Sequence, residues 1–406
     1  MSCKTVNKQR RPTLQVILQN MRVAGTLVLI ALVLVLVSPC AFSAEAQEPD
    51  PQQIFQDAAQ AQQRGDLVVA VSKYQEVIRL NPNVVAAHAN LGVVLVSLGR
   101  YDEAITQYHI ALAEAPGDPA LRLNLGLAYY KKGDFAAAAA QFASLHKENP
   151  GDLRVATLLG NCQVQLGLVD QAITLLEPLE KANPDNLDLE WALGNALIRT
   201  SQTLDGLKRI QKVADKGQNA DAHQLAADLY LGLTLFDQAK ENAQAVIRLN
   251  PDAAKAYVVL GMIDDFGGNE KDAQDNYRKA LQIDPKDNQA RLQLANAFLI
   301  DRKLDQAREE IDRALAIEPN SLAARYELAR LERTEGNLAA ALKDLEAIER
   351  QDPQWLPPHV ELSALYYRLQ RPSDGDREKE IVNRLRTEEQ DRRGQSRVIS
   401  PRVPLP

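Results

Sequence analysis

The stretch LGVVLVSLGRYDEAITQYHIALAEAPGD, residues 91–118, contains the pattern that decides the fold. Small residues stand at Gly92 and Ala104, and Pro116 closes the stretch. Apolar residues between these points recur at spacings of three and four, the period of an α-helix with one buried face. Gly99 lies between the two apolar stripes, where a helix commonly ends in a left-handed conformation. The stretch therefore predicts two short helices joined by a tight turn.

The same pattern recurs along most of the chain. Successive loop positions are 34 residues apart, except for one step of 33 residues after Lys216-Gly217-Gln218, which replaces the loop proline. A single helix pair of this size cannot bury its apolar faces, so neighbouring pairs must stack. We therefore expect nine units over residues 47–355. Their loop positions are 82, 116, 150, 184, 218, 251, 285, 319 and 353.

This periodic pattern resembles the tetratricopeptide repeat, whose 34-residue motif combines W-x2-L-G-x2-Y with later Ala, Phe and Pro positions. The resemblance covers about residues 51–355. It implies an all-α fold, an α-solenoid forming a right-handed superhelix of about nine helix-turn-helix repeats. We expect a capping helix pair over residues 356–390 and a disordered basic tail over residues 391–406.

The fifth unit departs most from the pattern. It has Gly206 where alanine is usual, Ser201 where the turn glycine is usual, and no loop proline. We interpret this unit as a flexible point that divides the array into two halves.

The N-terminal segment has the features of an export signal. Basic residues precede an uncharged stretch over residues 23–37, and small residues follow it. That stretch is short for a membrane span, which needs about 20 residues. We expect residues 1–46 to be a cleaved signal peptide, with Met21 as a possible true start, and the mature protein to be periplasmic or secreted. An uncleaved N-terminal anchor or a lipoprotein modified at Cys40 are the alternatives.

Charge and cysteine content exclude several classes of protein. The chain has 47 basic and 54 acidic residues, so it lacks the basic surface of a nucleic-acid binder. Removal of residues 1–46 leaves Cys162 as the only cysteine, so no intramolecular disulfide can form. Packing alone must then hold the fold. We expect no nucleic-acid partner, and membrane contact only through an uncleaved N-terminal segment.

No catalytic or metal-binding motif appears in the sequence. The chain has no phosphate-binding G-x-x-x-x-G-K-[ST] loop, H-E-x-x-H or G-x-S-x-G motif. His88, His223 and His359 share the fourth position of their first helices, which normally takes a packing residue. Cys162 stands where other units have apolar residues and is expected to be a core residue. We therefore expect a protein without enzymatic activity, cofactor or metal.

The resemblance also implies a binding face. In this family, recurring positions of each first helix line a concave groove. Asparagine amides there could both donate to and accept from a peptide backbone without specifying its sequence. Two alternatives stay open: the amides only solvate the face, and Trp191 packs between units. The predicted groove residues are Asn124, Tyr130, Asn161, Trp191, Asn195, Met262, Asn296, Tyr326 and Arg330, and the same positions also include Phe266.

These features favour a non-catalytic scaffold of the cell envelope or periplasm. The scaffold would hold a peptide segment or a protein partner in its concave groove. A self-assembling structural solenoid is one alternative, and an accessory subunit of an envelope polysaccharide-synthesis or secretion complex is another. The Lys/Asn/Arg clamp with which some family members grip a terminal carboxylate is not found in phase. The identity of the partner and the oligomeric state stay open.

Overall fold

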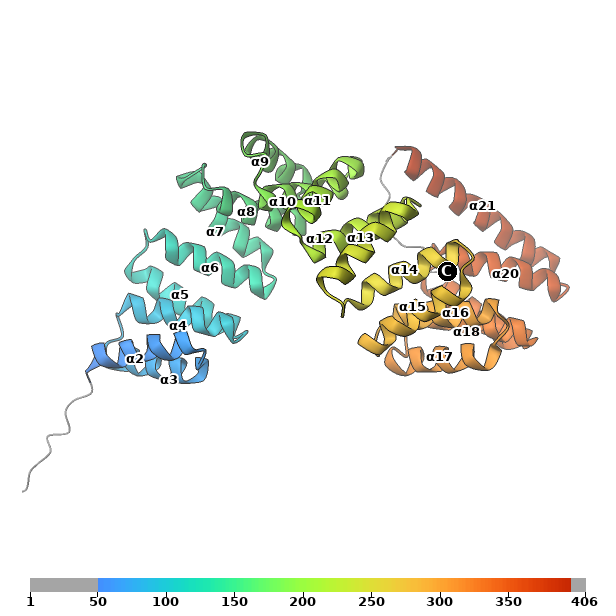
Figure 1. Ribbon diagram of the computed structural model, residues 1–406, viewed down its shortest axis with the longest axis horizontal. Coiled ribbons are helices and arrows are strands. Elements are labelled where there is room, and N and C mark those ends of the chain that lie inside the picture. The colour runs from blue at the N-terminus through green and yellow to red at the C-terminus, as the bar shows by residue number, and fades with distance from the viewer. Residues whose placement is uncertain (1–49, 396–406) are drawn as a thin grey trace, which may run out of the picture. The chain divides into compact units, whose positions relative to one another are not determined.

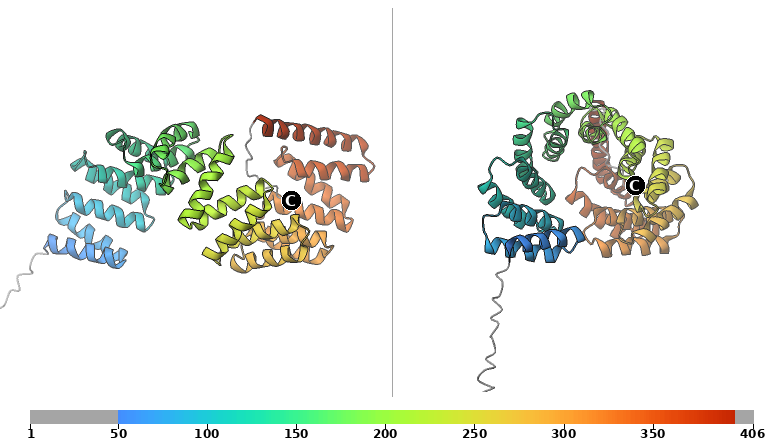
Figure 2. Two further views of the ribbon diagram at one scale, coloured as in Figure 1. Left: turned by 45° about the horizontal axis from the view of Figure 1, so that its top comes forward. Right: turned by 60° about the vertical axis from the view of Figure 1, so that its left-hand side comes forward.

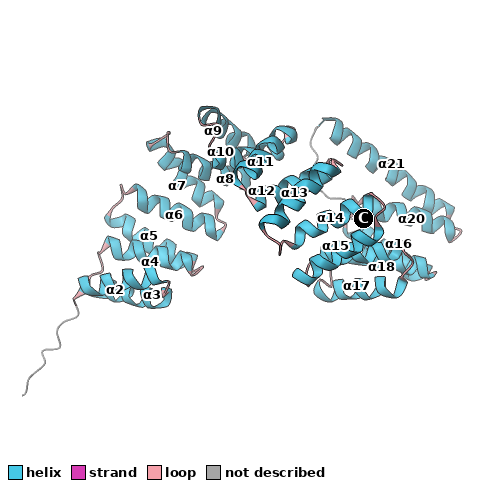
Figure 3. Cartoon of the chain, viewed as in Figure 1, coloured by secondary structure: helices cyan, strands magenta, loops and turns pink. Residues whose placement is uncertain are grey.

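A computed structural model describes residues 50–395 of the 406-residue chain. The described residues form helices joined by short turns, with no strand among them (Figure 3). They belong to two compact units, residues 1–98 and residues 99–406. The predicted signal segment, residues 1–46, lies outside the described residues, as do residues 396–406 of the predicted tail.

The helices follow one another as pairs along the chain (Figure 1). In chain order they make nine pairs from α2 to α19 and a tenth pair, α20 and α21, which confirms the predicted all-α array. The helices are α2 (Pro51–Arg64), α3 (Leu67–Leu80), α4 (Val85–Ser97), α5 (Tyr101–Glu114), α6 (Pro119–Lys132), α7 (Phe135–Glu148), α8 (Leu153–Gln165), α9 (Val169–Ala182), α10 (Leu187–Ile198), α11 (Thr203–Gly217), α12 (Ala220–Gly232), α13 (Phe236–Leu249), α14 (Ala254–Phe266), α15 (Glu270–Ile283), α16 (Asn288–Ile300), α17 (Leu304–Ile317), α18 (Leu322–Glu335), α19 (Leu338–Gln351), α20 (Leu356–Arg368) and α21 (Pro372–Gln395).

The first compact unit, residues 1–98, contains the helices α2, α3 and α4. Its core joins Ile54, Val77 and Ala87, one residue from each helix. Tyr74 is fully buried, and its hydroxyl donates a hydrogen bond to Gln62 Oε1 at 2.9 Å. The tyrosine thus fills the space between α2 and α3 while its polar end stays satisfied.

The second compact unit, residues 99–406, contains the helices α5 to α21. Each first helix packs on the second helix of its own pair, and that second helix packs on the next first helix (Figure 2). First helices of neighbouring pairs also touch, as α8 does with α10 and α16 with α18. Alanines at the small positions, such as Ala239, Ala273 and Ala307, are fully buried. They let the helices approach closely enough for larger apolar side chains to interlock.

In every pair except α10–α11, the turn between the two helices contains one residue with positive φ. Gly133 has φ 86°, and its N–H bonds back to the end of α6. Glycine adopts this conformation without strain. Three later turns use Thr234, Arg302 and Gln370 at φ 57° to 60°. A periodic glycine thus identifies only some of the turns.

Gly206 has a packing role. An added Cβ there would lie 2.7 Å from the carbonyl oxygen of Gly194 and 2.8 Å from the backbone nitrogen of Ile198. Both atoms belong to the backbone of the partner helix, so only glycine lets α10 and α11 approach this closely. The interpretation of this unit as a flexible point missed that contact, which makes Gly206 a site of close helix packing.

A polar contact recurs at the fourth residue of several first helices, and we call it the polar node. It joins this residue to the loop carbonyl six residues before it and to a side chain 19 residues after it. In α16, Arg291 donates to the carbonyl oxygen of Pro285 at 2.5 Å and to Glu310 at 2.6 Å. The node satisfies a loop carbonyl that the preceding helix leaves unpaired.

Histidines occupy the same node in other pairs. His223 Nδ1 lies 2.7 Å from Asn242 Oδ1, and His359 Nδ1 lies 2.7 Å from Glu378 Oε2. His88 Nε2 lies 2.7 Å from the carbonyl oxygen of Pro82. All three histidines thus have polar partners within the helical array, as expected at a packing position.

The last pair covers the end of the array. Val382 and Leu385 of α21 are buried, as expected for a cap with one apolar face. The helix continues to Gln395, five residues into the segment that we predicted to be a disordered tail. None of the helices within residues 50–395 has the length and apolar composition of a membrane span.

Candidate functional site

The predicted groove residues divide into exposed and buried groups. Asn124 and Asn161 lie on α6 and α8, and both are half-buried. Within the described residues, neither side-chain amide forms a hydrogen bond. Their donors and acceptors are therefore free to meet a partner or water.

Trp191 and Asn195 contribute mainly to the fold. Asn195 Nδ2 donates to the carbonyl oxygen of Trp191 at 2.8 Å, one turn earlier in α10. The Trp191 ring packs against a core cluster that includes Ile210 of α11 and Leu229 of α12. Trp191 therefore packs between units, as the alternative interpretation had it. The Asn195 amide keeps its oxygen and one N–H for other contacts.

Three other predicted residues are buried. Met262 is 7% exposed and belongs to the largest core cluster, which spans α12 to α18. Asn296 and Tyr326 are also buried, and Tyr326 packs on Trp355 with ring centroids 5.2 Å apart. Burial leaves these three residues little surface for a partner, and their predicted place in a groove stays a prediction.

Arg330 is the centre of a polar network in the same region. Its Nη1 donates to Asn296 Oδ1 and to Glu327 Oε2, both at 2.7 Å. Its guanidinium also lies over the Tyr326 ring. Glu327 is 2% exposed, and this burial raises its pKa to about 7 despite the neighbouring arginine. The network is internal, so Arg330 has limited capacity to bind a partner.

Tyr130 and Asp228 are half-buried on first helices. Tyr130 packs edge-on against Phe135, and burial raises the pKa of its hydroxyl. Asp228 takes the same helix position in α12 as Asn161 does in α8. Burial raises the pKa of Asp228 to about 6, with Gln224 donating a hydrogen bond to it at 3.0 Å. The face formed by the first helices thus carries amides, an aromatic ring and the carboxyl group of Asp228, which ionises less readily than an ordinary aspartate.

Two large apolar side chains stand out on α14 and α16. Phe266 is 62% exposed and Ile300 is 58% exposed, and both occupy the thirteenth position of their helices. Phe266 stacks on Phe236 with ring centroids 5.1 Å apart. The sequence analysis named Phe266 but missed Ile300. The sequence held a signal for Ile300: the equivalent residue is the charged Lys131 in α6 and the charged Arg199 just after α10, so an apolar residue there departs from the pattern.

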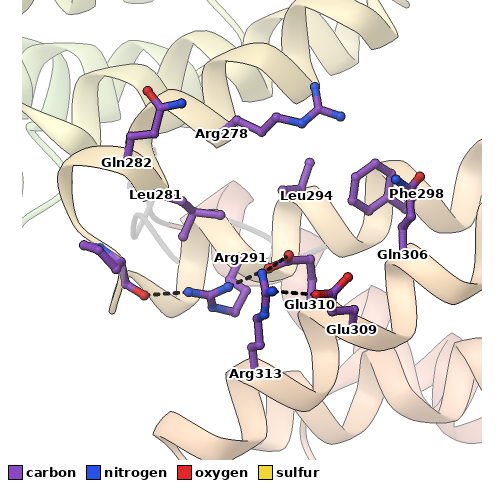
Figure 4. Close-up of a pocket in the computed structure, with 11 residues that line it drawn as sticks. Arg278, Leu281, Gln282, Arg291, Leu294, Phe298, Gln306, Glu309, Glu310 and Arg313 are labelled. Carbon is purple, nitrogen blue, oxygen red and sulfur yellow. Dashed lines mark hydrogen bonds and ion pairs between the residues drawn. The ribbon is translucent and has the colours of Figure 1, made fainter.

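A cavity of about 450 Å³ opens between α15, α16 and α17 (Figure 4). Its charged side chains largely pair with one another: Arg291 donates to Glu310 at 2.6 Å and Arg313 to Glu310 at 2.9 Å. Arg278 lies over the Phe298 ring. Two of its three walls are second helices, so it lies outside the predicted first-helix groove.

Cys162 is fully buried within the α7–α8 core. Burial raises the pKa of its thiol to about 12, so almost no thiolate forms near neutral pH. The prediction that Cys162 is a core residue is confirmed.

The sequence matches known families over much of the helical array. A tetratricopeptide repeat model matches residues 58–119, 91–153, 225–288, 266–321 and 292–354, and a second tetratricopeptide repeat model matches residues 129–197. Together these matches cover more than half of the chain. The chain belongs to the tetratricopeptide repeat (TPR) family. The TPR architecture supports a role in protein–protein interaction, in agreement with the predicted scaffold.

Individual similar proteins are distant. The probable biofilm formation methyltransferase WspC of Pseudomonas putida is 29% identical over 96 residues, 22% of this chain and 23% of that protein. This TPR chain thus matches only about a quarter of its relative's length. Yeast Tom70 is 14% identical with a TM-score of 0.41, over 86% of this chain and 97% of that one. A TPR protein of Parabacteroides merdae is 14% identical with a TM-score of 0.30, over 74% and 93% of the two chains.

Proposed function

We propose that this TPR chain is a non-catalytic scaffold that holds an extended segment of a protein partner along its first helices, from α6 to α16. The observation that supports it best is the set of accessible side chains there. Asn124 and Asn161 offer amides without internal partners, and Phe266 and Ile300 offer exposed apolar area. Amides bind a peptide backbone, whereas apolar side chains provide contact energy by leaving water.

Photocrosslinking tests this assignment directly. A photoreactive amino acid replaces Asn161 or Phe266 in separate variants, and the full chain is irradiated in cells. Both positions should crosslink the same partner. A photoreactive residue at Leu204 is the matched control, because Leu204 is 56% exposed on the second helix α11. A partner captured from position 204 but from neither first-helix position would place binding elsewhere.

A binding measurement then tests whether the side chains at these positions contribute to the affinity for the partner. The double variant Asn161→Ala and Phe266→Ala should lose most affinity for the captured partner, whereas Leu204→Ala should keep it. Far-UV circular dichroism of each variant confirms that the helices remain. Equal affinity of the double variant and the wild type would contradict the proposed face.

The envelope location is part of the proposal. The basic N-terminus followed by the uncharged residues 23–37 supports export of the mature chain. Fractionation of cells that express the native chain, with N-terminal sequencing of the product, tests it. A cytoplasmic product retaining residues 1–46 would refute export. An accessory role in an envelope synthesis or secretion complex would appear as copurification with that complex.

Self-assembly is a second candidate function. Val68 is 76% exposed and Val69 is 46% exposed on α3, in the first unit of the array. Adjacent apolar side chains of this kind favour contact with another copy. Sedimentation analysis of the wild type and the Val68→Ser, Val69→Ser variant tests this. A concentration-dependent dimer lost in the variant would support self-assembly, and a monomer in both would exclude it.

A further inference from the structure

Three ionisable side chains meet where the last helix pair packs on the ninth unit. Glu349 comes from α19, His359 from α20 and Glu378 from α21. One nitrogen or oxygen atom of each lies within 4.8 Å of the other two. His359 and Glu378 are almost completely buried, and Glu349 is half-buried. The sequence analysis missed this cluster because its members are separated by 10 and 19 residues, outside any familiar motif.

The orientation of His359 is fixed by a backbone acceptor. Its Nε2 lies 3.1 Å from the carbonyl oxygen of Pro353, which can only accept, so Nε2 bears a proton. The Nδ1 atom points instead toward Glu378 Oε2, 2.7 Å away. Metal-ligating histidines usually have this arrangement, in which the second nitrogen donates to a carbonyl and sets the tautomer.

The two carboxylates give the cluster an excess of negative charge. Within the described residues, Glu349 forms no hydrogen bond or ion pair. Burial raises the pKa of Glu349 and the adjacent Glu378 raises it further, whereas His359 and Arg377 oppose this shift. Arg377 lies 3.4 Å from the far oxygen of Glu378 and leaves the oxygen that faces His359 uncovered. A cation among the three side chains would be in reach of both carboxylates and of the imidazole nitrogen.

The same polar node elsewhere in the chain lacks these ligands. In the sixth unit, His223 is bonded to Asn242 rather than to a carboxylate. Val213 stands ten residues before His223, where Glu349 stands before His359. A structural histidine at this node therefore needs neither acid. The C-terminal node is the one among the described units that combines a histidine with two carboxylates.

We propose that Glu349, His359 and Glu378 form a binding site for a divalent transition-metal ion, with zinc as its representative. One imidazole nitrogen and two carboxylate oxygens suit zinc, which binds them at about 2.0–2.2 Å and takes water in a fourth position. Binding moves Nδ1 and Oε2 apart and releases the proton that they share. The ion joins α19, α20 and α21, so it fastens the last helix pair to the array.

Zinc titration of the full chain by calorimetry tests the site, after treatment with EDTA and alkylation of accessible thiols. The wild type should bind one zinc ion with release of a proton, and zinc should raise its melting temperature. Glu349→Gln should weaken binding at least about tenfold and remove the melting shift. This variant should fold, because the glutamate is partly exposed and unpaired.

Two further variants complete the test. Glu378→Gln should also lose zinc binding, whereas His223→Gln, at the equivalent node without acids, should bind zinc as the wild type does. Absence of saturable zinc binding in the wild type would overturn the proposal. Unchanged affinity in both Glu349→Gln and Glu378→Gln would overturn it as well, since the ion would then bind elsewhere.

Discussion

Replacement of Gly206 by alanine is the sharpest test of how this chain packs. In an ordinary helix the change would stabilise the protein by about 1 kcal/mol, because alanine has the higher helix propensity. Here the new methyl group would lie 2.7 Å from the Gly194 carbonyl oxygen and 2.8 Å from the Ile198 nitrogen. Those are backbone atoms, which cannot rotate away as a side chain can.

The magnitude follows from these distances. Ordinary contact begins at 3.4 Å, so α10 and α11 must move apart by about 0.7 Å. Overpacking of this kind typically costs about 1–3 kcal/mol. After the gain in propensity of about 1 kcal/mol is subtracted, we expect a net destabilisation of up to about 2 kcal/mol at this helix pair.

Urea unfolding followed by circular dichroism measures the effect. Stability in a repeat array depends on each unit and its neighbours, so a weakened fifth unit should broaden or split the transition. Hydrogen exchange should show the loss of protection confined to α10, α11 and the adjoining helices. Gly117→Ala, where a Cβ meets no atom within 4 Å, is the control and should change little. A more stable Gly206→Ala protein would refute the close-packing argument.

Three further predictions concern buried polar groups. The raised pKa of Glu327, about 7 against an ordinary 4.5, means that the folded chain retains a proton that the unfolded chain releases. Stability should therefore fall as pH rises from 4.5 to 7, by at most about 3 kcal/mol, and the fall should vanish in Glu327→Gln when melting is followed across this range. The Arg291→Met variant leaves the buried Glu310 paired only with the partly exposed Arg313. Urea denaturation should therefore show a decrease of about 3 kcal/mol in the free energy of unfolding. An unchanged free energy would mean that Glu310 is well solvated. Because burial raises the pKa of Cys162 to about 12, a thiol reagent at pH 8 should modify it only after denaturant is added. Rapid labelling of the native chain would show that the core around it opens.

The repeat architecture was predictable because its signals are local. The loop prolines, the small residues and the apolar spacing each depend on contacts within one pair or with the next. Their period therefore survives in the sequence. The turn glycines were informative for the same reason, although Thr234, Arg302 and Gln370 take equivalent positive φ values without any glycine. At those turns the packing of the flanking helices imposes a conformation that the residue itself disfavours.

The candidate site was less predictable because exposure depends on neighbouring units. Met262 and Asn161 share one helix position, yet Met262 is buried and Asn161 is half-exposed. Position within the repeat therefore identifies a side of the helix but not what covers that side. Gly206 shows a related limit, because a glycine in a sequence can indicate either a flexible backbone or the close packing of two helices. Only the facing backbone distinguishes the two.

The polar node has a consequence for how such a chain can change in length. In α16–α17, Arg291 finds its acid in the same pair and its carbonyl in the loop just before. Duplication or loss of that 34-residue segment as a whole would therefore keep this arginine together with its acid and its carbonyl acceptor. The C-terminal cluster differs from this node, because Glu349 reaches it from the preceding pair. Gene rearrangements that insert units should thus be tolerated within the array and penalised at the junction between α19 and α20.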